Sequence, residues 1–163
     1  MTTAALITTF YDAFARRDAE AMVACYAPDV VFSDPVFGEL GGERACQMWR
    51  MLCARGKDLR ISHRDVTADA DRGSAHWDAH YTFSATGRPV HNMVQASFGF
   101  RGGKIVRHDD VFDLYRWARQ ALGVKGLLLG WAPPVQHKIQ AQARAGLDAF
   151  VQAQAAGTAP RPR

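Results

Sequence analysis

The pattern of apolar residues changes period after Gly56, and this change limits the folds open to the chain. Before it, apolar side chains recur every three or four residues, which is typical of helices with one buried face. After it, the segments SAHWDAHYTFSA and VHNMVQASFGF alternate, so that every second side chain lies on the same face of a strand. The turns TGRP and RGGK are too short for crossover helices and predict antiparallel neighbours. We therefore expect an α+β protein whose helices cover one face of an antiparallel sheet.

The residues before Gly56 predict three helices and a strand. Apolar side chains at helical spacing indicate a helix over residues 3–16, and Asp18 is a suitable cap for a short second helix. Pro28 is expected to end that helix, ahead of a strand over residues 30–34. Paired glycines then precede a third amphipathic helix, which is expected to stop at Gly56.

The chain is expected to become helical again after the last strand. An apolar stripe that includes Ile139, Leu147 and Phe150 predicts a long C-terminal helix, which needs a surface to pack on. The four tryptophans are expected in the core or in a pocket wall. The predicted organisation is one domain over residues 1–122, a helical extension over residues 123–155 that packs on the body or on a partner subunit, and a flexible tail over residues 156–163.

The formal net charge of +4 comes from the last third of the chain. Residues 114–163 contain seven Lys and Arg against one acidic residue, whereas residues 1–113 contain 13 against 15. These basic residues are scattered over fifty residues and form no concentrated basic face, so we expect no nucleic-acid partner. The apolar runs are too short to span a bilayer, so no membrane partner is expected either.

The cysteines and the first residues bear on the compartment. Cys25, Cys46 and Cys53 form no C-x-x-C pair, and their odd number leaves one unpaired whatever bridges form. They are expected to be small, buried apolar residues in a reducing compartment. The start of the sequence, MTTAALITTFYDAFARR, has the spacing of an amphipathic helix and lacks the basic start of a signal peptide. A cytoplasmic protein is therefore expected.

Two aspartates share a predicted strand face with apolar residues. Asp34 alternates with Phe32, and an apolar wall on that side would raise the pKa of Asp34 and make it a usable acid or base near neutral pH. Alternatively, Asp34 opens an Asp-Pro turn and accepts hydrogen bonds from nearby backbone N–H groups. Asp110 shares its face with His108 and Phe112, and both a functional and a purely structural role fit it.

The order of these elements, with SDPVFG ending the first strand and GKIVRHDDVFDL in the last, resembles the nuclear transport factor 2-like superfamily over residues 6–122. Within it, the sequence is similar to the SnoaL-like and ketosteroid-isomerase-like proteins. The resemblance implies a cone, in which a strongly curved antiparallel sheet of the cystatin-like type wraps around N-terminal helices, here with an extra C-terminal helix. It also implies a homodimer. Members include isomerases, cyclases, dehydratases, epoxide hydrolases and non-catalytic binding modules, so the fold leaves the function open.

The steroid isomerases of this superfamily suggest a role for Asp34. By this resemblance, Asp34 lies at the position of their general base. Phe10, with Tyr11 beside it, lies where that family has an oxyanion-hole tyrosine, and Ala96 lies at or near the position of its protonated aspartate. Donors to a developing oxyanion are usually the largest catalytic contribution, so their replacement favours a binding module.

The limonene-epoxide hydrolases suggest a second set of roles. By this resemblance, Asp110 is at the water-activating position, Asp78 is at the proton-donor position and His76 replaces an arginine. Phe32 and Asp34 stand where that family has the tyrosine and the asparagine that help to hold the water. Alternation along the strand predicts otherwise for Asp78, because it places Trp77 on the inner face and Asp78 on the outer one.

We therefore expect acid–base chemistry of an isomerase, cyclase or hydrolase type on a small, mostly apolar organic molecule. The alternative is a non-catalytic ligand-binding or accessory dimer module with the same pocket. No cofactor is implied, and the histidines lack the spacing of a metal site. The predicted catalytic residues are Asp34, Asp110, Asp78 and His76, and the predicted substrate-binding residues are Phe10, Tyr11, Phe32, Trp49, Ala96 and Phe112.

Overall fold

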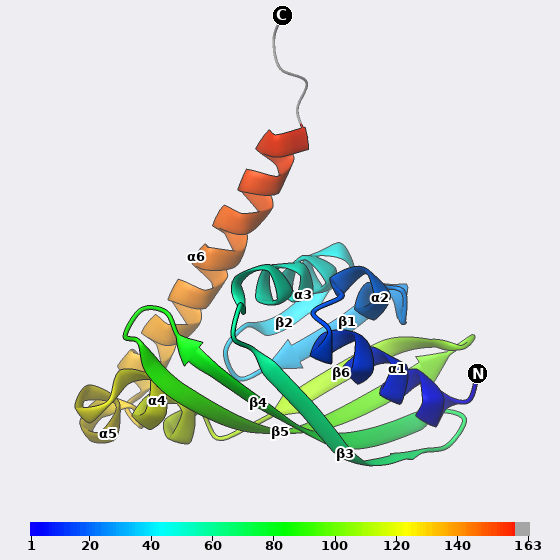
Figure 1. Ribbon diagram of the computed structural model, residues 1–163, viewed down its shortest axis with the longest axis horizontal. Helices are drawn as coiled ribbons and strands as arrows, with labels where there is room; N and C mark the ends of the chain where they lie inside the picture. The colour runs from blue at the N-terminus through cyan, green and yellow to red at the C-terminus, as the bar shows by residue number, and fades with distance from the viewer. Residues whose placement is uncertain (159–163) are drawn as a thin grey trace, which may run out of the picture.

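A single curved sheet of six strands organises the protein, whose computed structural model describes residues 1–158 (Figure 1). The strand order is β2-β1-β6-β5-β4-β3, and helices α1, α2 and α3 lie on one side of the sheet. The strands are β1 (Tyr26–Asp34), β2 (Gly38–Gly41), β3 (Arg60–Ala68), β4 (Arg72–Phe83), β5 (Arg88–Arg101) and β6 (Lys104–Val111). The helices are α1 (Thr3–Ala15), α2 (Ala19–Val23), α3 (Glu43–Arg55), α4 (Leu114–Leu122), α5 (Val124–Leu129) and α6 (Pro133–Thr158).

The sheet departs from the prediction at β1. Neighbouring strands are antiparallel except β1 and β6, which run parallel. The prediction of a purely antiparallel sheet is therefore wrong for β1 and β6. These two strands can run parallel because no hairpin joins them, since β2 to β5 lie between them in the sequence. β1 also starts at Tyr26, ahead of the predicted residue 30, and it includes Pro28. The β1–β6 register shifts between Tyr26 and Val31, where Pro28 has no N–H to donate.

Aromatic side chains join the helices to the sheet. Phe10 and Phe14 of α1 are buried and meet Trp49 of α3 at steep angles, with ring centroids 5.4 and 5.1 Å from that of Trp49. The predicted first and third helices are confirmed to within one residue at their C-terminal ends. The predicted cap of α2 is confirmed as well, since Asp18 Oδ1 accepts a hydrogen bond from the N–H of Ala21 at 3.0 Å. All three cysteines are free and buried.

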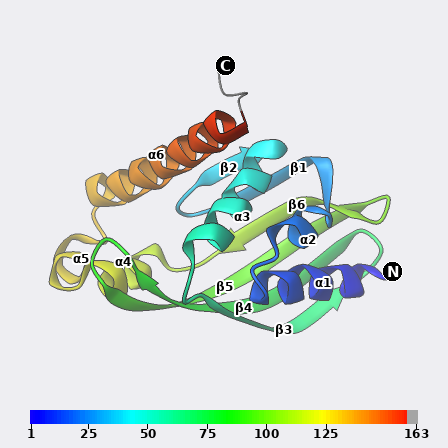
Figure 2. The same cartoon turned by 45° about the horizontal axis from the view of Figure 1, so that its top comes forward.

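Helix α6 packs on the body of its own chain, alongside α3 (Figure 2). Of its predicted apolar stripe, Leu147 is fully buried and Ile139 is 9% exposed. Gln140 Nε2 donates to the carbonyl oxygen of Pro35 at 2.9 Å, which ties α6 to the turn after β1. Packing of α6 on the body therefore removes the apolar side chains of its stripe from water, and this burial stabilises the helix.

The C-terminal region also holds two departures from the prediction. Helix α6 continues to Thr158, so residues 156–158, predicted as flexible tail, are helical, while residues 159–163 lie outside the described part of the chain. Trp131, expected in the core or in a pocket wall, is 64% exposed because the segment that carries it meets α4 through glycines. In residues 1–158, no helix combines the length and the apolar character needed to cross a bilayer.

Candidate active site

A row of buried hydrogen bonds runs from α3 to the sheet. The indole N–H of Trp49 donates to the hydroxyl oxygen of Tyr26 at 2.8 Å, and that oxygen lies 2.8 Å from Nδ1 of His108. Nε2 of His108 lies 2.9 Å from Oδ1 of Asp110, which also accepts from the indole N–H of Trp77 at 3.3 Å. His108 is 0% exposed and Asp110 is 4% exposed. The carboxylate of Asp110 is thus held by two donors in a nearly dry interior.

One assignment of the hydrogens gives every donor and acceptor of this row a partner. The oxygen of Tyr26 accepts from the indole N–H of Trp49, and its own O–H donates to Nδ1 of His108. Nε2 of His108 then carries the hydrogen that it donates to Asp110. With this assignment every member has a partner, and such a satisfied network keeps the ring and the carboxylate in one orientation.

Asp34 ends β1 and combines the two roles considered from the sequence. Its Oδ1 accepts hydrogen bonds from the backbone N–H groups of Val36 at 2.9 Å and Phe37 at 2.6 Å, as expected of an Asp-Pro turn. Burial and the negative charge of Asp110 nevertheless raise the pKa of Asp34 to about 6. The two aspartates therefore interact electrostatically, and Asp34 exchanges its proton close to neutral pH.

Tyr11 adds a hydroxyl group without a partner to the same interior. It lies on α1, it is fully buried, and its oxygen has no hydrogen-bond partner among residues 1–158. Burial and the charge of Asp110 raise the pKa of Tyr11 well above its ordinary value, so the hydroxyl keeps its proton. Buried polar groups are nearly always paired, and this one remains a hydrogen-bond donor with nothing to donate to.

Most of the predicted substrate-binding residues are packed around His108. Phe10, Phe32 and Trp49 are at most 1% exposed, and their ring centroids lie 5.4, 5.2 and 5.8 Å from that of His108. Ala96 of β5 is fully buried on the same face. These side chains are walls of the interior, filled against one another in this conformation.

Helix α4 covers the interior at the Asp34 end. The indole N–H of Trp117 donates to the hydroxyl oxygen of Tyr81 at 2.7 Å, and Phe112, half-buried, packs into the same apolar cluster. Burial raises the pKa of Tyr81, and the charge of Asp34 adds to the rise, so these two side chains are also near each other. Helix α4 therefore covers the end of the interior at which a substrate would approach Asp34.

Asp78 and His76, predicted to be catalytic, lie on the outer face of β4. Asp78 accepts from Arg64 at 3.1 Å and lies 3.3 Å from Nε2 of His91. Trp77, between Asp78 and His76, sends its N–H into the interior, so its two neighbours point away from it. The alternation of the strand is confirmed, and the roles implied by resemblance to the epoxide hydrolases do not fit this geometry. Asp34 and Asp110 lie on the inner side of the sheet, where the charge of Asp110 raises the pKa of Asp34, whereas Asp78 and His76 lie on the outer face.

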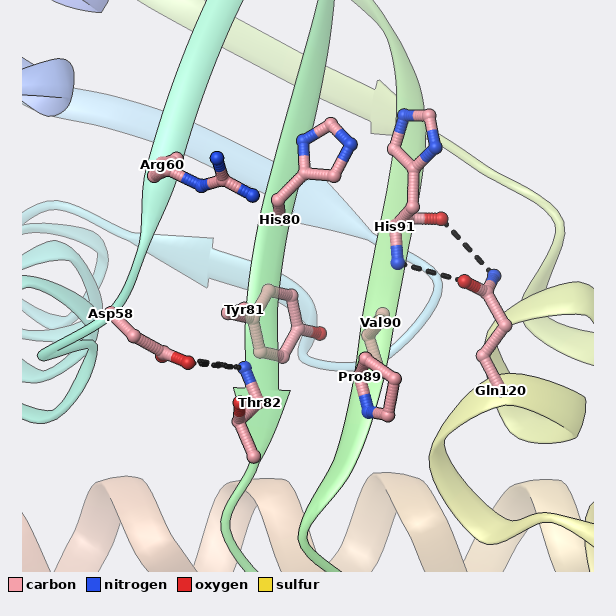
Figure 3. A pocket seen from close by; sticks show the side chains of 9 residues that line it. All are labelled: Asp58, Arg60, His80, Tyr81, Thr82, Pro89, Val90, His91 and Gln120. Atoms are coloured by element: carbon pink, nitrogen blue, oxygen red, sulfur yellow. Dashed lines mark hydrogen bonds between the residues drawn. The ribbon is translucent and has the colours of Figure 1, made fainter.

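A depression of about 480 Å³ lies on the outer face, where β3, β4 and β5 approach α4 (Figure 3). Arg60, His80 and His91 project side by side from the three strands, and the two imidazole rings stack with centroids 4.0 Å apart. Gln120 of α4 closes one side by accepting from the N–H of His91 at 2.7 Å and donating to its carbonyl at 3.1 Å. Within the described chain, no three His, Cys, Asp or Glu side chains are placed to hold a metal ion.

Sequence reasoning did not assign Tyr26 and His108 to the site. His108 precedes Asp110 by two residues on one strand, and this His-x-Asp spacing was a usable signal for their hydrogen bond. Tyr26 carried no comparable signal, because its partner His108 is 82 residues away and the parallel pairing of their two strands was not predicted.

The raised pKa of Asp34 predicts a pH-dependent stability. The carboxyl has its ordinary pKa of 3.8 when unfolded and about 6 when folded, so the folded state holds the extra proton between these values. The stability that this proton adds is complete below pH 4 and is lost as the pH rises through 6, at about 1.4 kcal/mol per pKa unit. Asp34→Asn keeps an oxygen for the turn and removes the titration. Relative to wild type, its free energy of unfolding in urea should rise by about 2 kcal/mol between pH 4.5 and pH 8; a difference that is constant with pH would contradict the assignment.

Solved structures with a similar fold come from several classes of protein. A candidate polyketide cyclase from Xanthomonas campestris is 26% identical, with 71% of this chain and 93% of that chain covered and a TM-score of 0.60. A hypothetical protein from Catenulispora acidiphila with a ketosteroid isomerase-like fold, solved with trimethylamine, is 17% identical over 81% of this chain and 100% of that chain, with a TM-score of 0.66. An epoxide hydrolase from M. tuberculosis, of the LEH-like type, is 20% identical over 80% and 95%, with a TM-score of 0.61. The last two show the fold alone.

These comparisons confirm the predicted fold class, a curved sheet with N-terminal helices and an added C-terminal helix. No match was found among curated proteins. The model of the SnoaL-like domain matches residues 7–108, which include most of α1, all of α2 and α3, and most of the sheet. The chain belongs to the SnoaL-like domain family.

Proposed function

We propose that this protein catalyses proton transfer on a small, mostly apolar organic molecule, with Asp34 and Asp110 as its acid–base pair. The observation that carries the proposal is the position of both carboxyl groups on the inner side of the sheet, where Asp110 is buried, Asp34 is partly buried, and the charge of Asp110 raises the pKa of Asp34. A carboxyl with a pKa of about 6 exchanges its proton readily near neutral pH, as general acid–base catalysis requires.

Intramolecular cyclisation is the reaction that fits these groups best. Asp110 takes a proton from a carbon next to a carbonyl group, and the enolate attacks a second carbonyl of the same molecule to form a carbon–carbon bond. Protonated Asp34 then gives its proton to the new alkoxide, and the proton on Asp110 passes back to Asp34 before the next turnover. The hydroxyl of Tyr11 donates a hydrogen bond to the enolate oxygen, which supplies a donor although Phe10 and Ala96 cannot. Atoms and electrons balance without a co-reactant.

The substrate class is proposed from the family and from the walls of the interior. The 26% identity to a candidate polyketide cyclase supports a substrate with several carbonyl groups along an apolar chain or ring. The walls supply apolar contact through Phe10, Phe32 and Trp49, and the row that ends at Asp110 supplies a fixed polar group. A substrate reaches this interior when α4 moves away from Tyr81, because Trp117 and Phe112 otherwise cover the Asp34 end.

The second candidate is a binding module without turnover. It is favoured by the tight filling of the interior, where rings surround His108, and by the open depression on the outer face lined by Arg60, His80 and His91. In that case the polar row would be a structural device that orients the sheet, and a ligand would bind outside it.

Deuterium exchange at the carbon next to the carbonyl of an aryl methyl ketone, followed by proton NMR in heavy water, tests the first step. We expect the wild type to accelerate exchange and Asp110→Asn to lose at least about a hundredfold of that acceleration, the usual contribution of a general base. Asp109→Asn is the matched control, because Asp109 is the next residue on β6 but points to the outer face, where it binds Arg107 and Ser33. Exchange that is equal in both variants would contradict the proposal, and ligand binding without exchange in the wild type would favour the binding module.

We also propose that the protein is a cytoplasmic homodimer that pairs through the outer face of the sheet. Free, buried Cys25, Cys46 and Cys53 suit a reducing compartment, and helices cover only the other face of the sheet. Met93 and Val111, 40% and 64% exposed, add apolar area to this open face. Light scattering at micromolar concentration should give about 36 kDa, twice the 18.0 kDa of one chain; a mass near 18 kDa would show a monomer.

A further inference from the structure

An apolar tip lies at one end of the molecule, away from the interior carboxylates. Helix α5 and the turn that follows it lie beyond the end of the sheet beside α4 (Figures 1 and 2). We use the name apolar tip for five residues with exposed fractions of 46–72%: Val124, Leu127, Leu128, Leu129 and Trp131. Single exposed apolar side chains are ordinary, but a contiguous group of this kind marks a surface that meets something other than water.

Glycines are the reason that these side chains face outward. A Cβ atom on Gly126 would overlap the carbonyl of Ala118, and one on Gly130 would come within 2.8 Å of the Cβ of Ala118. Helix α5 therefore sits directly on α4 with its glycine side, after a sharp turn at Gly123, whose φ of +66° favours glycine. The packed side of α5 has no room for large side chains, so its leucines project into solvent.

The segment that carries the tip is basic. Residues 114–147 contain five Lys and Arg and no Asp or Glu. Arg116 and Arg119 belong to α4, Lys125 to α5 and Lys138 to the start of α6, so all four belong to the elements that carry or adjoin the tip. Asp148, the first acidic residue after this stretch, is already paired with Arg44 at 2.8 Å. The tip is thus apolar, and the segment that carries it is positively charged, with Asp113 at the start of α4 as an acidic neighbour in the sequence.

We propose that the apolar tip docks on the surface of an anionic lipid bilayer. Leu127, Leu128 and Leu129 occupy consecutive positions of α5 and are all exposed, so they project in different directions, and a fluid bilayer accommodates such side chains without a matching groove. Trp131, whose N–H donates to the carbonyl of Leu128 at 2.9 Å, is of the residue type enriched at membrane interfaces, and basic neighbours attract anionic headgroups. A second copy is a poorer occupant, because two tips face to face would bring like charges together.

This docking is peripheral, and it revises the expectation that the chain has no membrane partner. That expectation depended on the length needed to cross a bilayer, whereas an interfacial segment inserts only its apolar side chains. The proposal is independent of the proposed catalysis, because none of the five residues of the tip lines the interior site.

Flotation of the full chain with vesicles at about 0.1 M salt tests the proposal. We expect binding to phosphatidylcholine vesicles that contain about a third phosphatidylglycerol, and at least tenfold weaker binding to vesicles of phosphatidylcholine alone. Leu128→Glu should weaken binding to the anionic vesicles at least tenfold, since it removes an inserted side chain and adds a negative charge. Ala141→Glu is the matched control, because it adds the same charge at an exposed position of α6 outside the tip, and it should stay within about threefold of wild type.

Leu128 and Ala141 are both exposed, so an unchanged melting temperature is expected for each variant and checks that it is folded. The proposal is overturned if the wild type does not float with the anionic vesicles, or if the two variants lose binding equally, which would mean that charge alone drives it. It is also overturned if the wild type self-associates through the tip without lipid and Leu128→Glu abolishes this association, since a second copy would then be the occupant.

Discussion

The hydrogen bonds that join Tyr26, His108 and Asp110 set the arrangement of the whole interior. A buried imidazole or carboxylate without partners costs several kcal/mol, so these three side chains require β1 and β6 to lie side by side in one register. Trp49 extends the same requirement to α3, because its N–H completes the bonding of Tyr26. Aromatic rings can then close around His108, and the interior becomes dry enough to raise the pKa of Asp34.

Helix α4 links the two surfaces to which we assign functions. On its inner side, Trp117 donates a hydrogen bond to Tyr81 at the Asp34 end of the interior. Gln120 forms hydrogen bonds with the backbone N–H and carbonyl of His91, in the part of β5 that extends beyond its pairing with β6. On its outer side, Ala118 receives the glycine face of α5. The short segment that covers the proposed site therefore also supports the apolar tip, although the two proposals depend on different residues.

Local patterns in the sequence predicted much of this fold. The features that they did not predict depend on pairings between segments that are distant in the sequence. Alternation correctly placed Trp77 inside and Asp78 outside, because the period of a strand is fixed by the backbone and overrides an analogy drawn from a related family. The parallel pairing of β1 with β6 and the short strand β2 had no local signature. The hydrogen bond between Tyr26 and His108 depends on the pairing of β1 with β6, so it could not be predicted from the sequence. The exposure of Trp131 likewise depends on how Gly126 meets α4, which side-chain periodicity does not describe.

Carbon-detected NMR titration of the aspartate carboxyl groups, in the wild type and in Asp110→Asn, tests the central claim that Asp34 and Asp110 form one coupled acid–base pair. We expect a midpoint near 6 for Asp34 in the wild type. We also expect a lower midpoint for Asp34 in the variant, because the asparagine carries no charge to oppose ionisation. A wild-type midpoint near the ordinary value of about 4, or a midpoint of 6 that does not move when Asp110 is replaced, would contradict this claim.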